Sequence, residues 1–183
     1  MGLLGGLFTG GELGGWSLDM HSANMLPQDV ATGFAAATEK LVGAKYVADA
    51  YIAKQLVNGT NHLMTAKITQ VTASAPTTRI LPVVLNIPAG DVTGEKATIR
   101  AVQNTGISDE LNASITALLE ASPRLGIEIK PILYVASQIV KGVNHYILCE
   151  TRSVYPNAVP TTMMLVVNQF QTNWSVVSLS EIE

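Results

Sequence analysis

The sequence contains one fourteen-residue segment twice. Residues 51–64 read YIAKQLVNGTNHLM, and residues 134–147 read YVASQIVKGVNHYI. Seven positions are identical at a constant offset of 83 residues: Tyr51, Ala53, Gln55, Val57, Gly59, Asn61 and His62 recur as Tyr134, Ala136, Gln138, Val140, Gly142, Asn144 and His145. Because each copy of an internal repeat is one structural unit, this chain of 183 residues is expected to form two similar subdomains.

Each copy is centred on the pattern Gln-x-Val-x-Gly. Aromatic and β-branched residues precede the glycine, and a second apolar run follows it, which predicts two strands around a hairpin tip. The glycine marks either a tight reversal or a place where another backbone comes close. We expect each tip to present a bare backbone. Turn chemistry alone would explain the glycine but not the recurring glutamine and valine.

The rest of each repeat also has a periodic pattern. A helical face begins near Pro27 and repeats at Val30, Phe34, Ala37 and Leu41; a second helix, capped by Ser108, repeats at Leu111, Ile115 and Leu118. Strands are predicted over residues 45–57, 60–72, 80–87, 97–102, 127–137, 143–152, 162–170 and 176–183. Each repeat therefore reads as one helix and four antiparallel strands. The predicted class is α+β, with a helix packed across a curved antiparallel sheet in each of two subdomains.

Three segments are expected along the chain. Residues 1–24 form a Gly-rich N-terminal arm, residues 25–103 the first repeat and residues 104–183 the second. The arm combines seven glycines with large apolar residues, so a regular element there loses much backbone entropy. Its apolar side chains suggest a surface for a partner, or for self-association with other copies of the chain.

Composition excludes several classes of partner and chemistry. A formal net charge of -3 leaves no basic patch for nucleic acid, and no apolar run approaches the ~20 residues that cross a membrane. The single cysteine, Cys149, cannot form an intrachain disulfide, and we see no charged leader, so a cytoplasmic location is expected. Neither a nucleophile turn, nor a phosphate loop, nor a metal-ligand cluster is recognisable. We therefore expect no enzyme activity, cofactor or metal.

The two Gln-x-Val-x-Gly motifs, with Gly14 and Gly15 ahead of the first helix, resemble the cystatins, in particular the disulfide-free stefin type. The resemblance implies a cystatin-like inhibitor whose trunk and two hairpins fill the active-site cleft of a papain-like cysteine protease. A tryptophan at a hairpin tip suits such an interface. The partner-binding residues so implied are Gly14, Gly15, Trp16, Gln55, Leu56, Val57, Asn58, Gly59, Gln138, Ile139, Val140, Lys141, Gly142 and Trp174.

The two repeats carry these parts unequally. The first has the trunk and its first hairpin but no tryptophan near Pro88–Asp91, whereas the second has Trp174 but no free trunk. The alternative is a structural or assembly protein, such as a subunit of a phage or viral particle, in which the motifs serve only as turns. A charged fraction of 14% and a positive mean hydropathy suit a chain that buries surface against other subunits.

Overall fold

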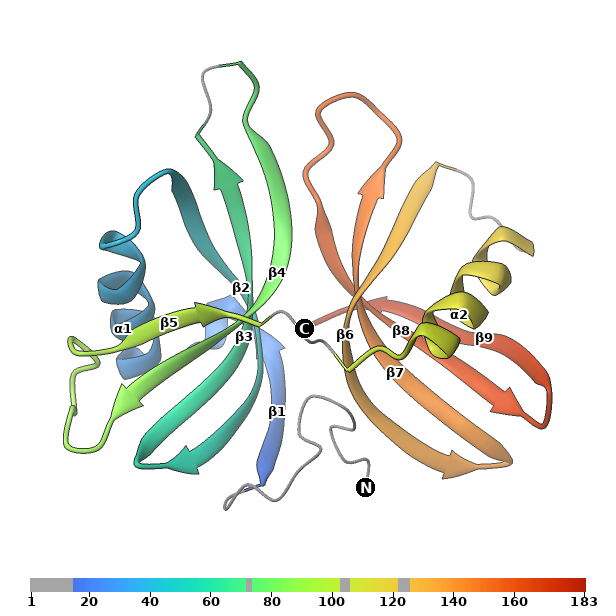
Figure 1. Cartoon of the computed structure of the whole chain (residues 1–183), viewed down its shortest axis with the longest axis horizontal. Coiled ribbons are helices and arrows are strands. Elements are labelled where there is room, and N and C mark those ends of the chain that lie inside the picture. The colour runs from blue at the N-terminus through green and yellow to red at the C-terminus, as the bar shows by residue number, and fades with distance from the viewer. Residues whose placement is uncertain (1–14, 72–73, 103–105, 122–125) are drawn as a thin grey trace. The chain divides into compact units, whose positions relative to one another are not determined.

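The computed structural model describes residues 15–71, 74–102, 106–121 and 126–183. These residues divide into two compact units. The first unit comprises residues 15–102 together with residues 182–183, and the second comprises residues 106–181. Figure 1 shows one twisted sheet and one α-helix in each unit. Gly14, which was expected to belong to the binding surface, lies outside the described residues.

The first unit contains a five-stranded antiparallel sheet in the order β1-β2-β3-β4-β5. Its strands are β1 (Trp16–Ser22), β2 (Ala44–Val57), β3 (Gly59–Gln70), β4 (Thr77–Pro88) and β5 (Thr98–Ala101). A short 3-10 helix, η1 (Ala23–Met25), connects β1 to the helix α1 (Gln28–Glu39). The strand β1 lies in the segment that the sequence predicted to be only an arm. The strand was missed because the glycines and scattered apolar residues of this segment lack the alternation of a half-buried strand.

The second unit contains a four-stranded antiparallel sheet in the order β6-β7-β8-β9. Its strands are β6 (Ile127–Val140), β7 (Gly142–Ser153), β8 (Thr161–Phe170) and β9 (Asn173–Glu181), and its helix is α2 (Asp109–Ala121). The repeat extends to irregularities of the backbone. The register of β2 on β3 shifts at Ala48/Ala50 and Tyr51/Ala53, and that of β6 on β7 shifts 83 residues later, at Pro131/Leu133 and Tyr134/Ala136.

The predicted α+β class, with a helix packed across the sheet of each subdomain, is wrong. Strands hold most of the described residues, which form two antiparallel sheets of five and four strands with only two α-helices. Helices of 12 and 13 residues are about 18–20 Å long, whereas a 14-residue strand extends about 46 Å. The helices are therefore too short to extend along the sheets, and the fold is mostly β.

Each unit has its own hydrophobic core. In the first, Val30 and Phe34 of α1 join a cluster with Met64 and Leu85 of the sheet. In the second, Leu111 and Ile115 of α2 join a cluster that includes Leu165. The predicted helical faces therefore supply core residues, and the hairpin tips lie at the ends of long strands that these cores hold in register.

Candidate protein-binding site at the hairpin tips

The first repeated motif forms the tip of the β2–β3 hairpin. Val57 pairs with Gly59, and Asn58 makes the reversal between them. Leu56 is 70% exposed, and Val57 and Asn58 are exposed beside it. Two apolar side chains at the end of an ordered hairpin offer a small binding surface that loses little entropy when a partner binds.

The corresponding tip of the second unit is the β6–β7 hairpin. Val140 pairs with Gly142 around Lys141, and Ile139 is 88% exposed. Ile139 occupies the position of Leu56 at the same 83-residue offset, so both tips carry a branched apolar residue in solvent. The positions predicted from the motifs thus lie on two equivalent hairpin tips, one in each unit.

The two motif glycines are held against the next strand. Gly59 and Gly142 have φ values of +105° and +93°, which favour glycine. A Cβ atom at Gly59 would collide with the carbonyl oxygen of Ile87, and one at Gly142 with that of Gln169. Another backbone does come close to these glycines, as the sequence predicted, and it belongs to the following strand of the same sheet.

The recurring glutamine is bonded within the sheet. Gln55 is only 3% exposed, and its Oε1 accepts a hydrogen bond from Asn61 Nδ2 at 3.1 Å. Asn61 Oδ1 in turn accepts one from Asn86 Nδ2 at 2.8 Å, so three amides connect β2, β3 and β4 just behind the tip. Gln138 differs, because it is exposed and accepts a hydrogen bond from the Tyr146 hydroxyl at 3.1 Å.

The predicted trunk of the first unit lies beside its hairpin. Trp16 begins β1 and is aligned with Gln55, while Gly15 is exposed just before it. On the other side, Gly59 is aligned with Pro88 at the end of β4. The start of β1, the β2–β3 tip and the turn after β4 therefore meet at one end of the sheet (Figure 1).

At the second tip, the exposed aromatic residue is one that the sequence analysis missed. Phe170 ends β8 and is 38% exposed, and Lys141 Nζ lies 5.3 Å from the centre of its ring. Asn168 Nδ2 also donates to the Lys141 carbonyl oxygen at 3.3 Å, which connects the β6–β7 tip to β8 within the second unit. Trp174 lies inside β9, packs against the core and stacks on His145. The position of Phe170, directly before the reversal at Gln171, was the available sequence signal.

The two repeated histidines are packing residues bonded to tyrosines. His62 Nδ1 lies 2.8 Å from the Tyr51 hydroxyl, and His145 Nδ1 lies 3.0 Å from the Tyr134 hydroxyl. Burial lowers the pKa of His62, an effect that Asp29 opposes and Lys54 reinforces. A buried histidine kept neutral by its surroundings and bonded to a tyrosine supports the strands behind the tip.

The single cysteine, Cys149, lies in the core of the second unit. Cys149 is fully buried, and burial raises the pKa of its thiol to about 12, which leaves it protonated. Within the described ranges, no group of three or more His, Cys, Asp or Glu residues could hold a metal ion. In the same part of the chain, neither helix has the length and apolar character needed to span a membrane.

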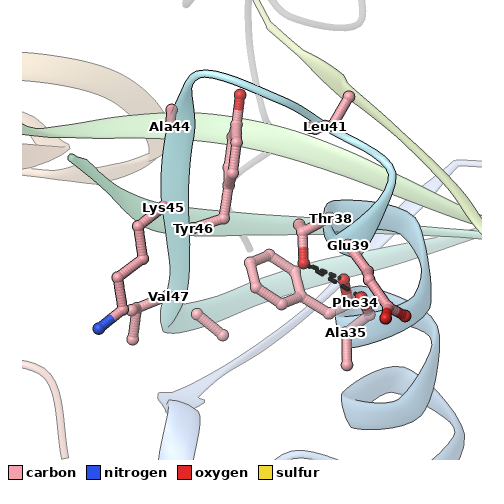
Figure 2. Close-up of a pocket in the computed structure, with 10 residues that line it drawn as sticks. Phe34, Ala35, Thr38, Glu39, Leu41, Ala44, Lys45, Tyr46 and Val47 are labelled. Carbon is pink, nitrogen blue, oxygen red and sulfur yellow. Dashed lines mark hydrogen bonds between the residues drawn. The ribbon is translucent and has the colours of Figure 1, made fainter. Parts of the chain in front are cut away.

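A groove of the first unit lies away from its tip. It has a volume of about 620 Å³ and is formed by the end of α1 and the start of β2. Figure 2 shows Phe34 and Thr38 on the helix side and Tyr46 on the strand side. Since the tip is at the far end of β2, this groove is separate from the candidate binding surface.

Comparison with known proteins yields neither a matching family model nor a matching curated protein.

Proposed function

We propose that the chain binds a papain-like cysteine protease and blocks its active-site cleft with the hairpin tips. The observation that carries the proposal is the placement of Leu56 and Ile139, exposed branched residues at equivalent tips of motifs that resemble the cystatin loop. In the first unit, the segments resembling a trunk and a second hairpin lie beside the tip.

The physical argument for inhibition is pre-organisation. The tip is fixed before a partner arrives by strand pairing and by hydrogen bonds among the side-chain amides of Gln55, Asn61 and Asn86. A preformed tip loses little conformational entropy on binding. Burying a leucine or isoleucine side chain contributes about 1.5–3 kcal/mol. A tip that enters the cleft intact would gain this burial energy. Cleavage of the tip as a substrate would instead require one of its strands to separate from the hairpin.

The test is a titration of papain, at a known concentration of active sites, with the full chain, in which the residual protease activity is measured. Tight inhibition is expected, and its stoichiometry counts the acting tips. Leu56→Glu and Ile139→Glu should each weaken inhibition by the tip they change, by about 10- to 100-fold, because the burial energy above is lost. Wild-type protein that folds but leaves papain fully active at micromolar concentration would refute the proposal.

Matched control variants separate the tips from general surface effects. Val42→Glu changes a 99% exposed valine of the first unit outside the tip, and Val154→Glu changes a 69% exposed valine of the second unit. Both should inhibit as well as the wild type. If the control variants lose as much inhibition as the tip variants, contacts at the tips do not explain binding.

A second candidate function is that of a structural or assembly subunit. The observation in its favour is the amount of exposed apolar surface outside the tips, including Val42, Val92 and Tyr155. Surfaces of this kind are covered when subunits associate. Sedimentation over a wide concentration range would support this candidate if the chain forms defined oligomers while leaving papain active.

A further inference from the structure

The two sheets differ at one edge. In the first unit, β1 covers the outer edge of β2. In the second unit, β6 corresponds to β2, and among the described residues no strand pairs with its outer edge. An edge strand presents unpaired N–H and C=O groups that can bind another strand. The outer edge of β6 is therefore a candidate surface for an extended polypeptide.

The edge of β6 repeats the side chains that receive β1. In the first unit, Trp16 is aligned with Gln55, Leu18 with Ala53 and His21 with Tyr51. The equivalents of those three β2 residues, at the 83-residue offset, are identical in type: Gln138, Ala136 and Tyr134. Three of the five β2 residues that are aligned with β1 are thus present a second time, while Lys54 and Ala50 are replaced by Ser137 and Leu133.

The backbone shape of this edge is also repeated. The β1–β2 register shifts between Leu18 and His21, opposite the irregularity of β2 at Tyr51/Ala53. β6 has its corresponding irregularity at Tyr134/Ala136. Because a bulge twists and bends a strand, an added strand must match that bend to continue the ladder. A strand with the geometry of β1 meets this requirement at β6 as it does at β2.

Exposure at the two edges follows the presence of β1. Gln55, aligned with Trp16, is buried, whereas Gln138 is exposed. The upstream part of β6 is less suitable, because Pro131 lacks an N–H group and blunts the edge there. The usable edge therefore runs from Leu133 to Gln138 and ends at the hairpin tip.

We propose that the outer edge of β6, from Leu133 to Gln138, binds an extended segment of a partner protein by antiparallel strand addition. The segment carries an aromatic residue and, two positions later, an aliphatic residue, as Trp16 and Leu18 do on β2. The aromatic residue lies opposite Gln138 and the aliphatic one opposite Ala136. Backbone bonds supply affinity and these two side chains set the register. This interaction goes beyond the proposed inhibition and needs no protease.

The probe is a synthetic peptide with the sequence of residues 15–22, GWSLDMHS, titrated into the ¹⁵N-labelled full chain. Because β1 of the same chain already occupies β2, the peptide should bind β6. Amide resonances of residues 133–138 should shift, with an affinity in the range of about 1 mM or tighter, and those of residues 50–55 should not. Shifts that favour residues 50–55, or no shifts at that concentration, would overturn the proposal.

Changes made in the peptide leave the fold of the protein untouched. N-methylation of alternate backbone nitrogens removes ladder donors, and the loss of two hydrogen bonds should weaken binding by about tenfold or more. A peptide with Leu18→Asp should also bind more weakly, because a carboxylate would lie against buried Ala136. Equal binding of the parent, the N-methylated peptide and a scrambled peptide would show non-specific contact and overturn strand addition.

Discussion

The two units share a hairpin and differ around it. Both have a positive-φ glycine against the next strand, a tyrosine–histidine bond and two register shifts at corresponding positions. They differ at the periphery, where the first sheet has β1 over its edge and a short β5, and the second ends in β6 and a long β9. The duplicated sequence therefore preserves the chemistry that shapes the hairpin, while the outer strands set which of its residues are exposed.

The glutamines show what this difference means for a binding surface. Gln55 and Gln138 occupy the same motif position, yet the first is buried in an amide network and the second is exposed. A motif residue can thus have a structural role in one copy and remain accessible in the other. Each tip has to be tested by itself, and the following variants compare the units directly.

The largest expected effect comes from adding a Cβ atom to the motif glycines. Gly59→Ala and Gly142→Ala should each lower the free energy of unfolding by about 3 kcal/mol or more, because the methyl group would meet a carbonyl oxygen at a positive φ. Urea unfolding monitored through Trp16 for the first unit and Trp174 for the second would measure both losses.

The control for this prediction is a second repeated pair of glycines. Gly43 and Gly126 also differ by 83 residues and have positive φ values, but a Cβ atom at either would meet nothing within 4 Å. Their alanine variants should lose only about 1–2 kcal/mol, from backbone strain. If all four variants lose the same amount, the contact with the neighbouring strand is unimportant.

The sequence predicted the repeated hairpins and most other elements because their signals are local. Alternating apolar residues and glycines indicated β2, β3, β6 and β7, and helical spacing indicated α1 and α2. Pairing between distant segments left no comparable signal, so β1 was missed. The class was wrong because periodicity finds a helix without showing how much of a sheet it covers.

The candidate site was predictable in its positions but not in the roles of its residues. The motif identified Leu56 and Ile139, which are exposed at the tips. It could not show that Gly59 and Gly142 face their own sheet, because that contact comes from the following strand. Nor could it show that Trp174 packs inward while Phe170 is exposed, since the direction of a side chain depends on the register of β8 and β9.

A smaller difference is expected at the tyrosine–histidine bonds. Tyr51→Phe leaves buried His62 without its tyrosine partner and should cost about 1–3 kcal/mol. Tyr134→Phe should cost less, because His145 Nε2 keeps a hydrogen bond to Gln169 Oε1 at 3.1 Å. Paired urea unfolding curves would measure both. Equal losses in the two units would mean that the bond to Gln169 does not compensate.

The stability of the first unit should also depend on pH through His62. Burial lowers the pKa of His62 below 6.5, so the unfolded chain binds a proton more readily than the folded one. Its contribution to stability is present above pH 6.5 and is lost as the pH falls through the lower folded pKa. Unfolding of the first unit at stepped pH values, beside the His62→Gln variant, should show a weaker pH dependence in the variant. An unchanged profile would show that other groups cause the loss.

The smallest expected effect concerns the groove beside α1 of the first unit. The corresponding region of the second unit contains a larger side chain. Val30 and Phe34 of α1 are buried, as are Leu111 and Ile115 at the equivalent positions of α2. In this alignment of the two helices Thr38 corresponds to Leu119, which packs against the second core. The smaller Thr38 lines the groove of the first unit instead. Thr38→Leu should therefore stabilise the first unit by about 0.5–1 kcal/mol, through apolar burial and helix propensity.

A threonine of α2 provides the matched control for that variant. Thr38 donates to the Phe34 carbonyl oxygen, and Thr116 donates in the same way to that of Asn112, each at 2.8 Å. Thr116 is exposed, so Thr116→Leu gains helix propensity with little burial. A larger gain in thermal stability for Thr38→Leu would show that the groove is space that a leucine fills in the second unit. Equal gains would mean that helix propensity alone is responsible.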